Sequence, residues 1–166
     1  RVRVGFGKLL EYLGCSCGLE LKHAPTKKQD RAEEKIKDAY EQQVKAGKKL
    51  PPACAWIPDL ERASFFAGDA TSLFKGIDLL EKLQGQTADI QRITGRKLDG
   101  IVIYRGKNRF AHAHFGYRDI SLNVGVHHAE DDFWHVTELQ LKLKGTEEIA
   151  RQQHELYEDF RTYFKG

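Results

Sequence analysis

The chain has 166 residues, of which 40% are hydrophobic and 31% are charged, and its formal net charge is +3. These values fit one soluble globular domain with its own core and exclude two full domains, and no apolar run is long enough to span a membrane. A net charge this small does not by itself indicate nucleic-acid binding.

The cysteine and methionine counts bear on compartment and processing. There are three cysteines, Cys15, Cys17 and Cys54, and no methionine. An odd, low cysteine count argues against a disulfide framework and predicts a reducing compartment, the cytoplasm or an organellar matrix, with a secreted effector domain as the alternative. Cys15 and Cys17 have no second Cys or His pair at zinc-site spacing, so we expect small residues near a turn there. Because no start Met is present, we expect a cleaved product or a fragment of a longer protein.

The first half of the chain predicts mostly helices. Apolar spacing over residues 4–14 predicts a short helix, and residues 15–28, broken by Gly and Pro, predict a loop. Residues 29–45 lack Gly and Pro and predict a highly charged helix. Residues 60–68 predict a short strand, and residues 69–85 predict a helix capped by their first residue, an aspartate.

The second half predicts strands followed by one helix. Residues 99–110, 116–125 and 133–145 predict strands, and the last two are close enough in sequence to form an antiparallel hairpin. Thr146 is expected to cap a final helix. The fold class predicted from this order is α+β: a mixed, largely antiparallel sheet of four to five strands flanked by helices.

One face of the predicted sheet is unusually polar. Polar and apolar side chains alternate along residues 116–125 and again along 133–145, and pairing of the two strands puts like sides together. The side chains expected on the polar side are Tyr117, Asp119, Asn123, Glu138 and Gln140, bordered by Arg105, Lys107 and Arg109. Carboxylates can hold Mg²⁺, cations can hold phosphates and an aromatic ring can stack on a base. The same pattern also fits a half-exposed sheet without a site.

Histidines offer a second candidate site. His112 and His114 are two residues apart, a spacing that aims both rings to one side of a strand, as some metal sites require. We favour a polar loop rich in histidine over a metal site.

Five short motifs follow one another along the chain: "KKQDRAEEKI" from residue 27, "IPDLERASFF" from 57, "KNRFAHAHFGYRD" from 107, "ELQL" from 138 and "HELYEDFR" from 154. In this order they resemble the motifs of RelA/SpoT-type nucleotide pyrophosphokinases, the alarmone synthetase-like family. The resemblance implies a nucleotidyltransferase-like α+β fold over residues 26–166. Residues 1–25 form an N-terminal helix and loop outside it.

The resemblance also implies an activity, which is Mg²⁺-dependent transfer of pyrophosphate from ATP to the 3′-hydroxyl of a nucleotide or an RNA end. Asp59 and Glu138 would hold the Mg²⁺ ion and act in catalysis. ATP would be bound by Lys27, Arg31, Lys35 and Arg62. The acceptor would be bound by Lys107, Arg109, Tyr117, Asp119, Gln140 and His154. The three ATP-binding cations of residues 27–35 share one helix face, which equally fits a solvated helix surface.

The sequence departs from the family pattern at four positions. Arg62 replaces a glycine, and Asp119 and Ser121 replace the serine and histidine of the acceptor-binding strand. Lys142 replaces an arginine, which keeps the charge and loses the bidentate fork. These differences indicate a divergent branch that acts on another acceptor. The alternative is a pseudoenzyme, a catalytically inactive domain that serves as a structural or interaction module, with a protein partner bound through the N-terminal segment or as part of a larger chain.

Overall fold

The computed structural model describes residues 2–24, 61–111 and 118–146, together with single positions elsewhere. The charged helix predicted over residues 29–45 and the helix predicted after residue 146 lie largely outside the described residues.

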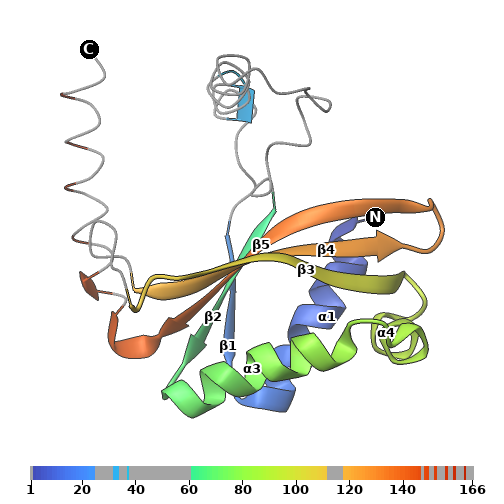
Figure 1. The fold of residues 1–166 in the computed structure, drawn as a ribbon, viewed down its shortest axis with the longest axis horizontal. Coiled ribbons are helices and arrows are strands. Elements are labelled where there is room, and N and C mark those ends of the chain that lie inside the picture. The colour runs from blue at the N-terminus through green and yellow to red at the C-terminus, as the bar shows by residue number, and fades with distance from the viewer. Residues whose placement is uncertain are drawn as a thin grey trace.

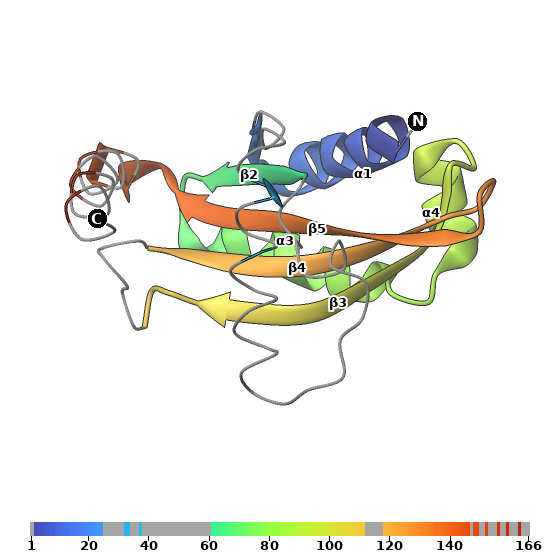
Figure 2. The ribbon, with the colours of Figure 1, turned by 90° about the horizontal axis from the view of Figure 1, so that it is seen from above.

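In the described part of the chain, five strands form one mixed sheet in the order β1-β2-β5-β4-β3. Figure 2 shows β2, β5, β4 and β3 side by side. The strands are β1 (Glu20–His23), β2 (Arg62–Ala67), β3 (Leu98–Asn108), β4 (Asp119–His128) and β5 (Phe133–Leu143). β2 pairs with β5 in parallel, and the other neighbouring strands pair antiparallel. The predicted α+β class with a mixed, largely antiparallel sheet is confirmed.

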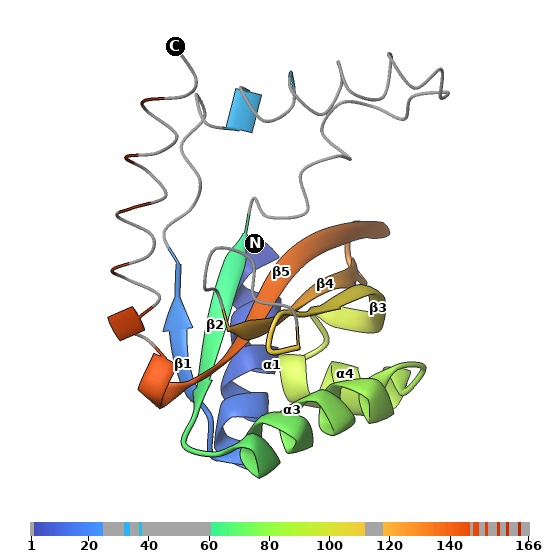
Figure 3. The ribbon, with the colours of Figure 1, turned by 60° about the vertical axis from the view of Figure 1, so that its left-hand side comes forward.

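Helices α1 (Val2–Cys17), α3 (Ala70–Leu83) and α4 (Thr87–Thr94) cover one face of this sheet (Figures 1 and 3). The core lies between the helices and this face of the sheet. It includes Leu9 and Leu13 of α1, Leu80 of α3, Phe65 of β2 and Leu141 of β5, all 2% exposed or less. No helix among the described residues is long and apolar enough to cross a membrane.

Two predicted elements are confirmed in detail. Helix α3 begins after Asp69, whose side chain accepts a hydrogen bond from the backbone N–H of Ser72 at 2.8 Å, as an N-cap should. Strands β4 and β5 form the predicted antiparallel hairpin, with Asp119 opposite Lys142 at one end and His128 opposite Phe133 at the other.

The N-terminal region differs from the prediction. Helix α1 continues beyond Gly14 to Cys17 and ends before Gly18, whose φ of 67° suits glycine and reverses the chain. The backbone N–H of Leu19 then bonds to the carbonyl of Gly14 at 2.9 Å. The loop predicted over residues 15–28 is wrong at Glu20–His23, which is the edge strand β1. Helix α4 was not predicted.

Candidate functional site

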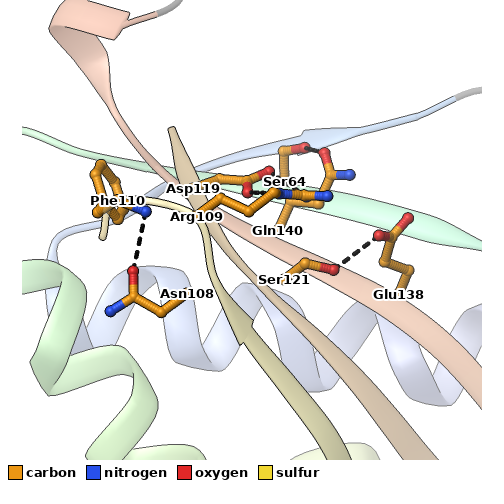
Figure 4. A network of polar contacts seen from close by, with 8 residues as sticks. All are labelled: Ser64, Asn108, Arg109, Phe110, Asp119, Ser121, Glu138 and Gln140. Atoms are coloured by element: carbon orange, nitrogen blue, oxygen red, sulfur yellow. Dashed lines mark hydrogen bonds and ion pairs between the residues drawn. The ribbon is translucent and has the colours of Figure 1, made fainter. Parts of the chain in front are cut away.

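The face of the sheet opposite helices α1, α3 and α4 carries the predicted polar row. In the register of β4 and β5, Ser121 lies opposite Gln140 and Asn123 lies opposite Glu138. On the other side of β5, Glu138 lies opposite Arg62 of β2. The structure therefore brings three strands together around Glu138, and Figure 4 shows the polar contacts among them.

Glu138 is held at the middle of this face. The hydroxyl of Ser121 donates a hydrogen bond to Glu138 Oε1 at 2.8 Å, and Ser121 itself is only 4% exposed (Figure 4). The backbone N–H of Glu138 donates to the carbonyl oxygen of Glu61 at 3.0 Å. A buried donor on a neighbouring strand fixes the orientation of the carboxylate. Alternation along its strand placed Ser121 on the polar side, but it was predicted as a departure from the family pattern and not as a site residue.

Gln140 occupies the next position along β5 on the same face. The Ser64 hydroxyl donates to Gln140 Oε1 at 3.4 Å, a long hydrogen bond. Arg62, predicted to bind ATP, lies two residues before Ser64 on β2 and is exposed. The Arg62 cation of β2 and the Gln140 amide of β5 are thus both neighbours of Glu138.

Arg109 and Asp119 form a bidentate ion pair at the start of β4. Arg109 Nη2 donates to Asp119 Oδ2 at 2.8 Å, and Arg109 Nε donates to Asp119 Oδ1 (Figure 4). The side chain of Asp119 is 2% exposed and that of Arg109 is 25% exposed. Arg109 therefore uses Nε and Nη2, two donors that together could bind a phosphate, to bind this carboxylate instead.

Lys142 lies beside this pair, opposite Asp119 in the strand register. Its ammonium lies 5.5 Å from the centre of the Phe66 ring, and the ammonium of Lys22 lies 4.5 Å from the same ring. Burial lowers the pKa of Lys142 by disfavouring the charged form, and the Asp119 carboxylate acts in the opposite direction. Asp119 thus lies between two cations.

The exposed cations Arg105 and Lys107 border the row on β3, opposite Asn123 and Ser121. The structure therefore describes Arg62, Lys107, Arg109, Asp119, Glu138 and Gln140 of the predicted site and places them on or beside one sheet face. The predicted site residues Lys27, Arg31, Lys35, Asp59, Tyr117 and His154, with the histidines at 112 and 114, lie outside the described residues. Within the described ranges, no group of three or more His, Cys, Asp or Glu side chains could hold a metal ion.

Comparison with known proteins gives matches at the level of structure. No protein-family model matches the sequence. A search of curated proteins finds no match either.

Three solved structures illustrate the likeness. A GTP pyrophosphokinase family protein from Streptococcus pneumoniae matches with a TM-score of 0.66 and 15% identity over 97% of this chain and 74% of that chain. The small alarmone synthetase 2 from Bacillus subtilis matches with a TM-score of 0.61 and 10% identity, over 96% of this chain and 78% of that chain. The small alarmone synthetase 1 from B. subtilis, bound to its product pppGpp, matches with a TM-score of 0.56 and 11% identity, over 83% of this chain and 62% of that chain. The chain therefore has the fold that its motifs predicted, that of RelA/SpoT-type synthetases.

Proposed function

We propose that this chain is a divergent nucleotide pyrophosphokinase domain that transfers pyrophosphate from ATP to the 3′-hydroxyl of a nucleotide or an RNA end. The observation that carries the proposal is the carboxylate of Glu138, oriented by Ser121 at 2.8 Å in the middle of the sheet face opposite the described helices. Cations border that face on both sides, and the fold is that of the synthetases.

In this proposal Glu138 acts on the acceptor. The acceptor 3′-oxygen attacks the β-phosphorus of ATP, the bond from that phosphorus to the α,β-bridging oxygen breaks, and AMP leaves. The proton of the 3′-hydroxyl passes to the Glu138 carboxylate. Ser121 occupies one carboxylate oxygen and so fixes the direction of the other.

In this proposal Glu138 would help to hold a magnesium ion. Mg²⁺ prefers hard oxygen ligands, and the Glu138 carboxylate and the Asn123 amide lie opposite one another on adjacent strands. Asp59 would add a second carboxylate. When bound, Mg²⁺ would offset the charge of the transferring phosphates.

The cations divide between the two substrates. Arg62, on the β2 side of Glu138, would contact the phosphates of ATP, together with Lys27, Arg31 and Lys35 of the charged segment. Lys107, on the β3 side, would contact the acceptor, together with Arg109 and the aromatic ring of Tyr117. Because Asp119 neutralises Arg109, we expect the acceptor to differ from those bound by an unpaired arginine.

Glu138→Gln tests the assignment, because it keeps the size of the side chain and removes the charge. We expect transfer of pyrophosphate from ATP to a panel of nucleotides and RNA ends, followed as AMP formation, to fall about a hundredfold or more. Glu130→Gln, on the β4–β5 loop, is the matched control and should leave the rate unchanged. An unchanged rate of AMP formation in Glu138→Gln would refute the proposed function.

One observation favours the second candidate, an inactive module with a structural or interaction role. In the Arg109–Asp119 pair, the carboxylate occupies two guanidinium donors that phosphate binding would use. Under this alternative, a folded chain binds neither ATP nor its analogues.

A further inference from the structure

At the β4–β5 hairpin end of the sheet, the face opposite helices α1, α3 and α4 is aromatic and apolar. Tyr104 of β3 is 58% exposed and Trp134 of β5 is 49% exposed. Val102 and Val136 are half-buried and lie opposite Gly125 of β4 from its two sides. Exposed aromatic side chains grouped with aliphatic ones indicate an interaction surface, because tyrosine and tryptophan are enriched where proteins bind partners.

Two backbone features bring these rings together. The register of β3 and β4 shifts between Ile103 and Arg105, so Tyr104 lies in a bulge, and a bulge redirects the side chain that it carries. A Cβ added at Gly125 would overlap Tyr104 Cε2 and would lie 3.3 Å from Trp134 Cε3. Both rings therefore lie over the same point of β4, where glycine permits the close approach. We call Tyr104 and Trp134 the aromatic platform.

Charge is distributed unevenly along this sheet face. The lysines and arginines lie level with Glu138 or on the side of it away from the hairpin: Arg62, Arg105, Lys107, Arg109 and Lys142. The loop that joins β4 to β5 instead carries Glu130, Asp131 and Asp132, all exposed, and we call these three residues the acidic loop. The aromatic platform is therefore at the acidic end of the face.

His127 connects the acidic loop to the aromatic platform. It lies opposite Trp134 in the hairpin register, and its ring centre is 5.1 Å from the ring centre of Trp134. Nδ1 of His127 is 2.6 Å from Asp99 Oδ1, and Nε2 is 3.2 Å from Asp132 Oδ1. Two carboxylates are therefore separated from the indole ring by a single side chain.

The charge of the acidic loop is only partly balanced within the chain. Lys97 pairs with Glu130 at 2.6 Å. In the described part of the chain, neither Asp131 nor Asp132 forms an ion pair with a lysine or an arginine, and the side chain of Asp132 is 96% exposed. A polyanion such as RNA would be repelled at this end of the face, whereas a cationic partner would be attracted.

Aromatic faces and carboxylates together suit a cation. The face of a tryptophan ring attracts an ammonium or a guanidinium group more strongly than the other aromatic rings do. Arginine fits best, because its planar guanidinium stacks on a ring while its N–H groups bond to carboxylates. Tryptophan, tyrosine and arginine also contribute most to the binding energy of protein interfaces.

We propose that the aromatic platform and the acidic loop form a docking surface for an arginine-bearing basic segment of a protein partner. One arginine of the partner stacks on Trp134, and neighbouring basic residues of the partner meet Asp131 and Asp132. Asp119 and Lys142 lie at the other end of the same strands. The docking surface is therefore separate from the candidate catalytic site and does not depend on pyrophosphate transfer.

The test uses the full 166-residue chain with fluorescently labelled hexa-arginine and hexa-lysine peptides as probes. Fluorescence polarisation measures their binding at about 0.15 M salt, where charges more than about 8 Å apart are largely screened. We expect hexa-arginine to bind more tightly than hexa-lysine. In Trp134→Leu the affinity for hexa-arginine should fall about two- to fivefold, the scale of one exposed cation–π contact, and the affinity for hexa-lysine should fall less. The double variant Asp131→Asn, Asp132→Asn should weaken binding of both peptides about threefold.

Three further variants serve as controls. Trp134→Phe keeps an aromatic ring and should retain part of the affinity that Trp134→Leu loses. Phe74→Ala and Glu81→Gln remove an exposed ring and an exposed carboxylate from helix α3, on the other face of the sheet, and should leave both affinities unchanged. Hexa-arginine binding needs no catalytic turnover, so this proposal and the proposed function fail separately.

Several results would overturn the proposal. Failure of the folded wild-type chain to bind hexa-arginine would do so, as would equal affinity of the wild-type chain and Trp134→Leu for that peptide. Equal losses for the two peptides in Trp134→Leu would show a structural effect of the ring in place of stacking. Binding of single-stranded oligouridylate that is lost in Trp134→Leu would assign the surface to RNA.

Discussion

Replacing Arg109 should destabilise the fold more than replacing Asp119, although both changes break the same ion pair. Removing one partner of a buried pair costs about 3–5 kcal/mol, because the other charge is left uncompensated. Arg109→Leu leaves the carboxylate of Asp119, which is 2% exposed, without its two hydrogen bonds from Arg109 and with Lys142 as the neighbouring cation, whereas Asp119→Asn leaves a guanidinium that is already 25% exposed and can reach water. We therefore expect losses of about 4 kcal/mol for Arg109→Leu and about 2 kcal/mol for Asp119→Asn.

Urea denaturation followed by circular dichroism measures these free energies of unfolding, provided that the dependence on urea concentration stays unchanged. The double variant Arg109→Leu, Asp119→Asn should be more stable than Arg109→Leu alone, since the buried carboxylate that lost its arginine is then neutral. Lys97→Leu is the control, because it breaks an exposed pair with Glu130 of 2.6 Å and should cost less than about 1 kcal/mol. If both single variants cost no more than this control, the reasoning from burial is refuted.

Two further predictions concern glycine and pH. Gly7→Ala should raise the free energy of unfolding by about 0.5–1 kcal/mol, because helix α1 leaves the new methyl group in open space. Gly5→Ala should not show this gain, because its Cβ would lie 2.9 Å from the Cβ of Lys97. If thermal unfolding showed Gly5→Ala to be the more stable of the two variants, the packing argument would be contradicted. Burial lowers the pKa of His128 in the folded chain. Below about pH 6.5 the unfolded chain therefore binds a proton at His128 more readily than the folded chain does, and the free energy of unfolding should fall as the pH falls through that value. His128→Leu should reduce this fall in urea titrations between about pH 7.5 and about pH 5.5, and an identical pH dependence would show that His128 does not cause it.

The long elements were predictable because their patterns are repeated over many residues. The strand predicted over 99–110 is observed as Leu98–Asn108, and the helix predicted over 69–85 as Ala70–Leu83. Strand β1 was missed because it has four residues, three of them exposed, and exists only through its pairing with β2. Helix α4 was missed because it has eight residues and buries only Ile90 and Thr94.

The sequence predicted which sheet face carries the candidate site, but it did not predict the contacts among the site residues. Alternation along two strands placed Glu138 and Gln140 on the polar side, where the structure has them. The pairing of Arg109 with Asp119 depends on how β3 and β4 are joined across ten residues, which alternation does not encode.

The parallel pairing of β2 with β5 has a consequence for the order of folding. It joins residues 76 positions apart, such as Ser64 and Gln140, whereas β4 and β5 are joined by a short turn. Closing a long loop costs more chain entropy, and contacts distant in sequence form slowly. We therefore expect the hairpin to form early, bringing Ser121 to Glu138, and β2 to dock late with Arg62. The two halves of the candidate site then form at different times, and the side that carries Arg62 is completed last.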